Sequence, residues 1–252
     1  MSSSIWTRCA GDSEIHALRL TPWRVVESQH RVSTRALVDT LEEQALLEEM
    51  IDTAKPADPT RGRLHYLLAT PFRYPPLPHG SRFGARHERG IWYGAESIPA
   101  AMAEVAYYRL LFLEGTTAEL ASVKAELTAF RVRVRTERGV DLVMPPFASH
   151  RAAIASPTSY AASQPLGSAM REAGVQAFRY PSARDPEGGV NVGVMDPEAF
   201  HSARPRDMES WWCTATRERV ELVRRDLVAA HALTFLRASF LVRGKLPAPG
   251  IA

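Results

Sequence analysis

Cysteine is scarce in this sequence of 252 residues, and no long apolar run is present. Its two cysteines, Cys9 and Cys213, are far apart and fit no metal-ligand spacing, so we expect no metal site and a reducing compartment. No segment approaches the roughly 18 apolar residues that a membrane-spanning helix needs, and the N-terminus lacks the apolar core of a signal peptide. These absences predict a cytoplasmic protein with no membrane partner.

Lysine is also rare, since Lys55, Lys124 and Lys245 are the only ones and arginine supplies the other basic residues. The 31 basic residues exceed the 28 acidic residues by only three, which is too little to argue for nucleic-acid binding. We attribute the excess of arginine over lysine to a GC-rich genome, and we interpret the five arginines from Arg217 to Arg237 as a solvated face. We therefore expect no direct contact with nucleic acid.

Several familiar catalytic patterns are missing. The sequence has no glycine-rich fingerprint after a strand, no phosphate loop ending in Gly-Lys-Ser/Thr, no zinc helix with paired histidines and no nucleophile elbow. Nothing therefore supports a Rossmann-type dinucleotide site or a metal hydrolase. We also expect no prosthetic group.

The chain divides into three parts, of which the first, residues 1–60, is predicted to be an N-terminal helical extension. Its segment 31–56 has helical spacing of apolar residues, with Leu37, Leu41 and Met50 on one stripe and with Ser33 or Thr34 as the cap. This stripe must pack either on the core that follows or on a partner subunit.

The second part, residues 61–200, is predicted to be the core, and the third, 201–252, to complete it with a strand and a long helix. The core mixes strand and helix periodicities without the regular alternation of a doubly wound sheet, so we expect an α/β or α+β domain. The predicted strands are 64–72, 90–96, 130–137, 175–184 and 190–196, and the predicted helices are 97–115 and 159–174.

One compact stretch, residues 80–112, brings a cation, an aromatic ring and a carboxylate together. Arg82 lies in a glycine-rich turn, where a guanidinium suits an anion such as phosphate. Tyr93 ends a short strand, and Glu104 lies on the next helix among small residues that would let it face a cleft. The alternative interpretation is that Arg82 and Glu104 form a structural ion pair and that Tyr93 is a core aromatic.

The segment 72–110, FRYPPLPHGSRFGARHERGIWYGAESIPAAMAEVAYYRL, resembles the signature of the RES-domain family. The family's arginines fall on Arg73 and Arg82, its tyrosine on Tyr93 and its glutamate on Glu104. Arg24, in PWRVVES, is a rival to Arg73. The segment QPLGSAMREAGVQAFRYPSARDPEGGVNV supplies the family's serine as Ser182, with Asn191 shortly after it.

The resemblance, which covers about 65–200, implies an ADP-ribosyltransferase-like fold with a small split β-sheet and flanking helices. It implies the toxin of a bacterial toxin–antitoxin pair, neutralised by a co-encoded antitoxin with an Xre-type helix-turn-helix domain. Any contact with nucleic acid would then be made by the antitoxin and not by this chain. The implied reaction consumes NAD⁺ as a substrate, by phosphorolysis or hydrolysis. The alternative is mono-ADP-ribosylation of a cellular protein by the same site, since phosphate, water and a protein side chain can all attack the same carbon.

The resemblance also assigns roles to residues, and the chemistry of NAD⁺ suits them. Glu104 would oppose the charge of the oxocarbenium-like transition state, because nicotinamide is already a good leaving group. Arg82 and Arg73 would bind the diphosphate, and Tyr93 the nicotinamide face. Ser182 would orient the ribose or the acceptor, and Asn191 is expected beside it in the NAD⁺ site.

Two other classes of function remain as alternatives. One is a binding protein that keeps the core but has lost catalysis, which the intact Arg82, Tyr93, Glu104 and Ser182 argue against. The other is a DNA-binding regulator built on 201–252, which lacks any recognisable helix-turn-helix.

Overall fold

The computed structural model describes residues 4–28, 38–74, 78–226 and 231–248. The α-helices in these ranges are α1 (Ile5–Arg8), α2 (Leu41–Ala54), α3 (Tyr66–Arg73), α4 (Ile98–Gly115), α5 (Arg151–Ile154) and α6 (Ser163–Glu172). The strands are β1 (His16–Leu20), β2 (Trp23–Glu27), β3 (Trp92–Ala95), β4 (Val123–Arg131), β5 (Val134–Asp141), β6 (Ala177–Pro181), β7 (Val190–Val194), β8 (Arg206–Ala215), β9 (Arg219–Arg224) and β10 (Ala232–Leu236).

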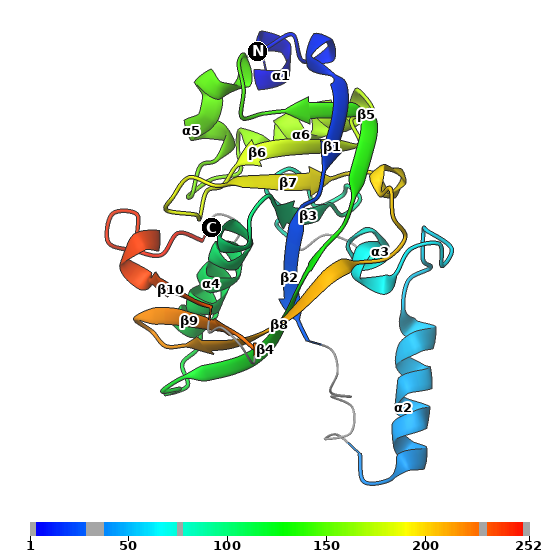
Figure 1. The fold of residues 1–252 in the computed structure, drawn as a ribbon, viewed down its shortest axis with the longest axis vertical. Coiled ribbons are helices and arrows are strands. Elements are labelled where there is room, and N and C mark those ends of the chain that lie inside the picture. The colour runs from blue at the N-terminus through cyan, green and yellow to red at the C-terminus, as the bar shows by residue number, and fades with distance from the viewer. Residues whose placement is uncertain (1–3, 29–37, 75–77, 227–230, 249–252) are drawn as a thin grey trace.

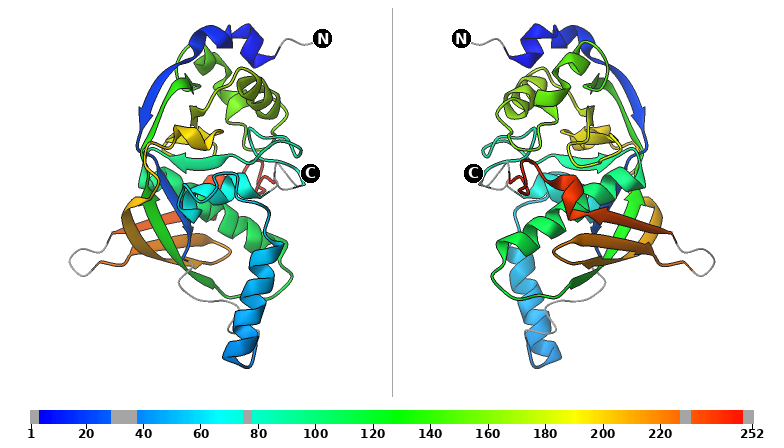
Figure 2. Two further views of the ribbon diagram at one scale, coloured as in Figure 1. Left: turned by 90° about the vertical axis from the view of Figure 1, so that its right-hand side faces the viewer. Right: turned by 90° about the vertical axis from the view of Figure 1, so that its left-hand side faces the viewer.

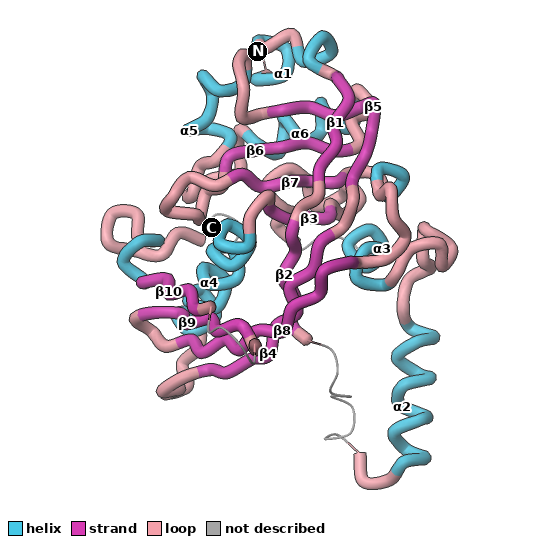
Figure 3. The backbone as a smooth tube through the Cα atoms, in the orientation of Figure 1, coloured by secondary structure: helices cyan, strands magenta, loops and turns pink. Residues whose placement is uncertain are grey.

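These strands form one sheet of ten, in the order β1-β5-β6-β7-β3-β2-β4-β8-β9-β10 (Figures 1 and 3). In the described chain, β2 pairs with β3 only where Trp23 lies opposite Ala95, whereas β2 pairs with β4 along its whole length. The sheet is therefore split at this join into an upper half (β1, β5, β6, β7, β3) and a lower half (β2, β4, β8, β9, β10). The predicted α+β class and split sheet are confirmed, although the sheet is larger than the small one expected.

Helices cover the two halves separately (Figure 1). Helix α4 packs on the lower half, where Tyr107 and Leu110 meet Trp211 and Leu222 in one apolar cluster. On the upper half, α1 and α6 cover one face around Phe178. Helix α3 covers the other face around Trp92. At the join itself, Ala95 packs with Ala100 and Ala101 of α4 and with Trp23 in a small separate cluster.

Helix α4 confirms the prediction for 97–115, and its local signals explain its bounds. The Ser97 side chain accepts a hydrogen bond from the Ala100 amide at 3.3 Å, and Pro99 occupies the first turn. Ala100, Ala103 and other small side chains are buried, which lets the helix approach the sheet closely. No helix of the described residues, α4 included, is long and apolar enough to cross a membrane.

The strand predicted at 64–72 is wrong, because Tyr66–Arg73 forms helix α3. The His65 ring nitrogen Nδ1 accepts a hydrogen bond from the Leu67 amide at 3.3 Å and caps the helix. A short apolar run is compatible with either a buried strand or a buried helix, and here the cap and the packing of Leu68 and Phe72 decide for the helix.

The long helix predicted within 201–252 is also wrong, because β8, β9 and β10 occupy this part of the chain. In β9 the burial alternates: Val220 and Leu222 face the core, while Arg219 and Val223 are exposed. This period of two belongs to a strand, and it lets β9 pair with β8 on one side and β10 on the other. Strands β8 to β10 thus complete the core from residues 201–252.

The N-terminal 60 residues are more than the helical extension expected, because β1 and β2 are members of the sheet. Strand β1 pairs with β5, and β2 pairs with both β3 and β4. Their partners come from far along the chain, so no local pattern marked these two five-residue strands. Part of the first 60 residues therefore belongs to the core.

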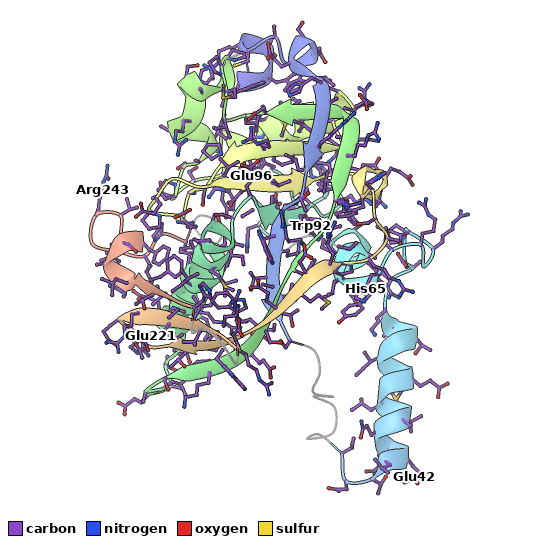
Figure 4. The ribbon with its side chains drawn as sticks, in the orientation of Figure 1. Glu42, His65, Trp92, Glu96, Glu221 and Arg243 are labelled. Atoms are coloured by element: carbon purple, nitrogen blue, oxygen red, sulfur yellow. The ribbon has the colours of Figure 1, made fainter. Side chains whose placement is uncertain are left out.

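Helix α2 is present within the predicted segment 31–56, but it points away from the rest of the molecule in every view (Figures 1 and 2). Leu41 and Met50 are 70% and 60% exposed, so the predicted stripe does not pack on the core. Glu42 marks the end of α2 farthest from the sheet (Figure 4). Leu37 and the predicted caps Ser33 and Thr34 lie outside the described residues.

The alternating segment 130–137 keeps its predicted pattern but is not one strand. Phe130, Val132 and Val134 are buried, and Arg133 and Arg135 are exposed, as expected. The chain nevertheless passes from β4 in the lower half to β5 in the upper half within this segment. The segment therefore links the two halves of the split sheet.

Candidate active site

A cavity of about 520 Å³ opens where β2 and β3 diverge at the split of the sheet. Lining residues come from helix α4, from β2 and Leu127 in the middle of β4, and from the turn before β3. Of the residues predicted for the site, this cavity brings together Arg82, Tyr93, Glu104 and Asn191. Ser182 and Arg73 are not among its lining residues.

Glu104 projects from α4 into this cavity. Its Oε1 accepts a hydrogen bond from Asn191 Nδ2, on β7, at 2.9 Å. Burial raises the pKa of the Glu104 carboxyl, while the nearby charges of Arg82 and Arg184 and the Asn191 hydrogen bond lower it. The cavity thus holds a carboxylate whose ionisation depends on two neighbouring guanidinium groups.

Arg82 is 8% exposed and is held by backbone carbonyls rather than by a carboxylate. Its Nη1 donates to the carbonyl oxygens of Ser156 at 2.8 Å and Ile154 at 3.3 Å. The guanidinium also lies over the Tyr160 ring, 5.1 Å from the centroid. Among the described residues it makes no ion pair within 4.0 Å, so the structural pair with Glu104, weighed as an alternative above, is not formed.

Tyr93 lies on β3 and connects this strand to the turn that carries Arg82. Its hydroxyl shares a hydrogen bond with Ser81 Oγ at 2.9 Å and accepts one from the Phe83 amide at 3.2 Å. Burial raises the pKa of Tyr93 to about 12, so the ring remains neutral. Its hydroxyl is engaged within the protein, which leaves the ring itself to contact a ligand.

Of Arg73 and its rival Arg24, it is Arg24 that lines the cavity. Its Nη1 donates to the Tyr93 carbonyl at 3.0 Å, at the point where the split leaves β3 without a full strand partner on that side. The guanidinium lies 5.3 Å from the ring centroid of Trp92, which Figure 4 labels near the centre of the molecule. Burial lowers the pKa of Arg24 to about 10, so it stays charged at neutral pH.

Arg73 lies at the end of α3, away from the cavity. Its Nε donates to the Pro56 carbonyl, so the side chain ties α3 to the segment that precedes it. The structure therefore places Arg24, and not Arg73, beside Arg82.

Ser182 is buried in the turn after β6 and acts on the backbone. Its Oγ accepts hydrogen bonds from the amides of Arg184 at 3.2 Å and Asp185 at 3.0 Å. The turn that it holds carries Arg184 into the cavity, where the guanidinium stacks 3.6 Å from the Tyr107 ring centroid and donates to the Pro157 carbonyl. Ser182 is thus a positioning residue in this structure, two residues from the side chain that faces the cavity.

Arg184 and the tyrosines Tyr108, Tyr160 and Tyr180 are lining residues that the sequence reasoning missed. Tyr108 carried a usable signal, because it follows Glu104 by four residues and so shares its helix face. Arg184 stands two residues after Ser182, in the same quoted segment. Tyr160 and Tyr180 had no local signal.

The charges in the cavity are unbalanced. Arg24, Arg82 and Arg184 donate to backbone carbonyls, and among the described residues none of them forms an ion pair within 4.0 Å. Glu104 is the carboxylate beside them, and the other two charged residues of the lining, Glu27 and Arg109, pair with each other. Three guanidinium groups without an ion-pair partner and one carboxylate suit a ligand that carries more than one negative charge, such as a diphosphate. In the described chain, no three His, Cys, Asp or Glu side chains gather as metal ligands.

Comparison with protein families matches residues 55–216 to the RES domain. The chain belongs to the RES-domain family. The matched range includes Arg82, Tyr93, Glu104 and Asn191, and it begins after Arg24. One of the arginines that line the cavity, Arg24, therefore comes from a strand that precedes the part of the chain matched by the family.

Among solved structures, the fold is similar to a chain of the crystal structure of the M. tuberculosis MbcT–MbcA toxin–antitoxin complex. The TM-score is 0.47 and the sequence identity 16%, over 80% of this chain and 88% of that chain. No curated protein matches the sequence.

Proposed function

We propose that this RES-domain protein cleaves the bond between nicotinamide and ribose in NAD⁺ and so depletes NAD⁺ as the toxin of a toxin–antitoxin pair. The observation that supports the proposal is the charge arrangement of the cavity. One carboxylate, Glu104, lies beside three guanidinium groups that lack a carboxylate partner in the described chain. This is the arrangement that a diphosphate joined to a reacting ribose requires.

The reaction needs little acid catalysis. When the C1′–N bond breaks, its electron pair leaves with nicotinamide, which becomes neutral, and the ribose carbon becomes positively charged. The Glu104 carboxylate opposes this charge, and Asn191 holds the carboxylate in place. An oxygen of phosphate, water or a protein side chain then bonds to C1′ and gives up its proton.

The remaining residues bind and orient the substrate. Arg24, Arg82 and Arg184 surround the position for the diphosphate, and the Tyr93 ring is available to the nicotinamide face. The toxin role and the co-encoded Xre-type antitoxin come from the resemblance of the motifs to the family. Mono-ADP-ribosylation of a protein remains the alternative outcome of the same cleavage.

The test is to incubate the purified protein with NAD⁺, with and without phosphate, and to identify the products by chromatography and mass spectrometry. We expect nicotinamide together with ADP-ribose or its 1″-phosphate, whereas a labelled protein would favour the alternative. Glu104→Gln should lower turnover roughly 10²-fold, because it removes the charge but keeps the size. Intact NAD⁺ with the wild-type protein, or wild-type turnover by a folded Glu104→Gln variant, would contradict the proposal.

A further inference from the structure

The cavity continues beyond the residues that bond cleavage uses. Tyr108 and Phe112 follow Glu104 on α4 at spacings of four and eight residues, so the three side chains share one face of the helix. At 1.5 Å per residue, Phe112 lies roughly 12 Å along the helix from Glu104. The cavity therefore has a second end, about as far from the reacting ribose as the other nucleoside of a dinucleotide would extend.

This second end of the cavity, called the slot below, is lined by aromatic and aliphatic side chains. Tyr108 and Phe112 are 56% and 55% exposed although both line the cavity. Val25 and Leu127 line the cavity from the lower half of the sheet. Large aromatic side chains gain stability when they are covered, so two exposed rings that line a cavity together with apolar side chains favour a flat ligand group against them.

An ion pair lies at the same end. Glu27, at the end of β2, accepts a hydrogen bond from Nη2 of Arg109 on α4, and both residues line the cavity. The Arg109 side chain is 20% exposed and that of Glu27 is 63% exposed. Arg109 thus differs from Arg24, Arg82 and Arg184, because its guanidinium is already paired with a carboxylate.

We propose that this slot binds the adenosine half of the substrate and that Glu27 makes the site selective for NAD⁺ over NADP⁺. The inference rests on the proposed function and names the substrate more closely. A carboxylate can accept a hydrogen bond from a ribose 2′-hydroxyl, but it repels a 2′-phosphate. Glu27 also holds Arg109, the cation at this end that would otherwise bind the 2′-phosphate.

The first test compares kcat/KM for NAD⁺ and NADP⁺. We expect the wild-type protein to prefer NAD⁺ by roughly 100-fold in kcat/KM. Glu27→Gln should reduce this preference to roughly tenfold or less, mainly because its kcat/KM for NADP⁺ increases. The double variant Glu27→Gln/Arg109→Gln should lose this gain, because the freed guanidinium is then absent. Glu114→Gln is the matched control, since Glu114 is also on α4 and paired, with Arg237, but does not line the cavity. The preference of this variant for NAD⁺ should equal that of the wild type.

A binding measurement separates this inference from the proposed function, because it needs no turnover. Calorimetry with ADP-ribose and 2′-phospho-ADP-ribose should show the same preference in the wild type and the same relaxation in Glu27→Gln. Selective binding of ADP-ribose without NAD⁺ cleavage would leave the inference standing and contradict the proposed reaction. Cleavage of NAD⁺ and NADP⁺ at equal efficiency, an unchanged preference in a folded Glu27→Gln variant, or binding of neither ligand would overturn the inference.

Discussion

At the scale of single residues, the site depends on how Glu104 and the arginines balance one another. Burial makes the charged form of Glu104 costly, and Arg82 and Arg184 offset part of that cost. The three arginines in turn donate to backbone carbonyls, which accept their hydrogen bonds without supplying a negative charge. A bound diphosphate would supply the missing negative charge.

The raised pKa of Glu104 predicts the pH dependence of the reaction. The ionised carboxylate is the active form, so kcat/KM should decrease as the pH is lowered, and this decrease should begin at a pH above the usual range of a glutamate. In Glu104→Gln this acid-side decrease should be absent. The free energy of unfolding depends on pH in the opposite direction. A carboxyl pKa raised by folding stabilises the protein below the unfolded-state pKa, and this contribution is lost as the pH rises through the folded-state pKa. Glu104→Gln should therefore melt at a higher temperature than the wild type at neutral pH.

Both readouts are needed to test this prediction, one from pH–rate profiles and one from thermal melts. A wild-type profile that is flat down to the ordinary glutamate range, or a lower melting temperature for Glu104→Gln at neutral pH, would contradict it.

A second prediction at this scale separates Arg24 from Arg73. Arg24→Lys keeps a positive charge but lacks the planar fork with which a guanidinium binds phosphate oxygens in pairs, so affinity for ADP-ribose should fall roughly tenfold or more. Arg73→Ala should leave the affinity unchanged, because Arg73 bonds to the Pro56 carbonyl outside the cavity. Calorimetry with both variants, checked for folding by circular dichroism, makes the comparison. Equal losses in the two variants would show that Arg73 also contributes to the site.

At the scale of elements, the turn between β6 and β7 explains how one arginine reaches the cavity. Ser182 holds the amides of Arg184 and Asp185, and the Asp185 carboxylate then accepts from the amides of Glu187 and Gly189. The turn is thus fixed by side-chain acceptors along its whole length, and the direction of the Arg184 side chain follows from it.

We expect Ser182→Ala to act through this turn. Losing two hydrogen bonds to buried amides should lower the free energy of unfolding by about 1–3 kcal/mol. The misplaced Arg184 should raise KM, while kcat changes much less, because Ser182 does not line the cavity. Ser182→Thr, which keeps the acceptor oxygen, should recover both properties. A loss confined to kcat with unchanged stability would instead indicate that Ser182 contacts the reacting groups.

At the scale of the whole molecule, the split of the sheet creates the site. The two halves share the join at Trp23 and Ala95 and then diverge, and each half is covered by its own helices. The cavity takes Arg24 from the lower half, Tyr93 and Asn191 from the upper half and Glu104 from the helix between them. Both halves must therefore be present before the site exists.

An open cavity of this kind predicts a neutralising partner if the protein consumes NAD⁺. Expression alone should arrest growth with loss of NAD⁺, and co-expression of the neighbouring antitoxin gene should restore growth. A partner that inserts a carboxylate or chain terminus against Arg24 and Arg82 would block the site directly. Calorimetry should then show that the purified complex no longer binds ADP-ribose. A complex that bound ADP-ribose and turned over NAD⁺ as well as the free protein would contradict this occlusion.

The parts of the site that lie close together in the chain could be predicted from the amino-acid sequence. Arg82, Tyr93 and Glu104 fall within one short stretch, and the cap at Ser97 and the proline at Pro99 set the helix that carries the carboxylate. Motif order added Asn191, which the structure brings to hydrogen-bond distance of Glu104. Local spacing is sufficient here because a turn, a strand and a helix in succession fix one another's geometry.

Which distant residues join them depends on the assembled fold and could not be predicted in the same way. Arg24 reaches the cavity because β2 pairs with β4, where Arg24 lies opposite Phe130, and no local pattern encodes a pairing between segments so far apart. The same pairing places Glu27 opposite Leu127 and so brings it to Arg109. Side-chain periodicity reports which face of an element is buried, whereas the identity of its neighbour depends on how the whole sheet assembles.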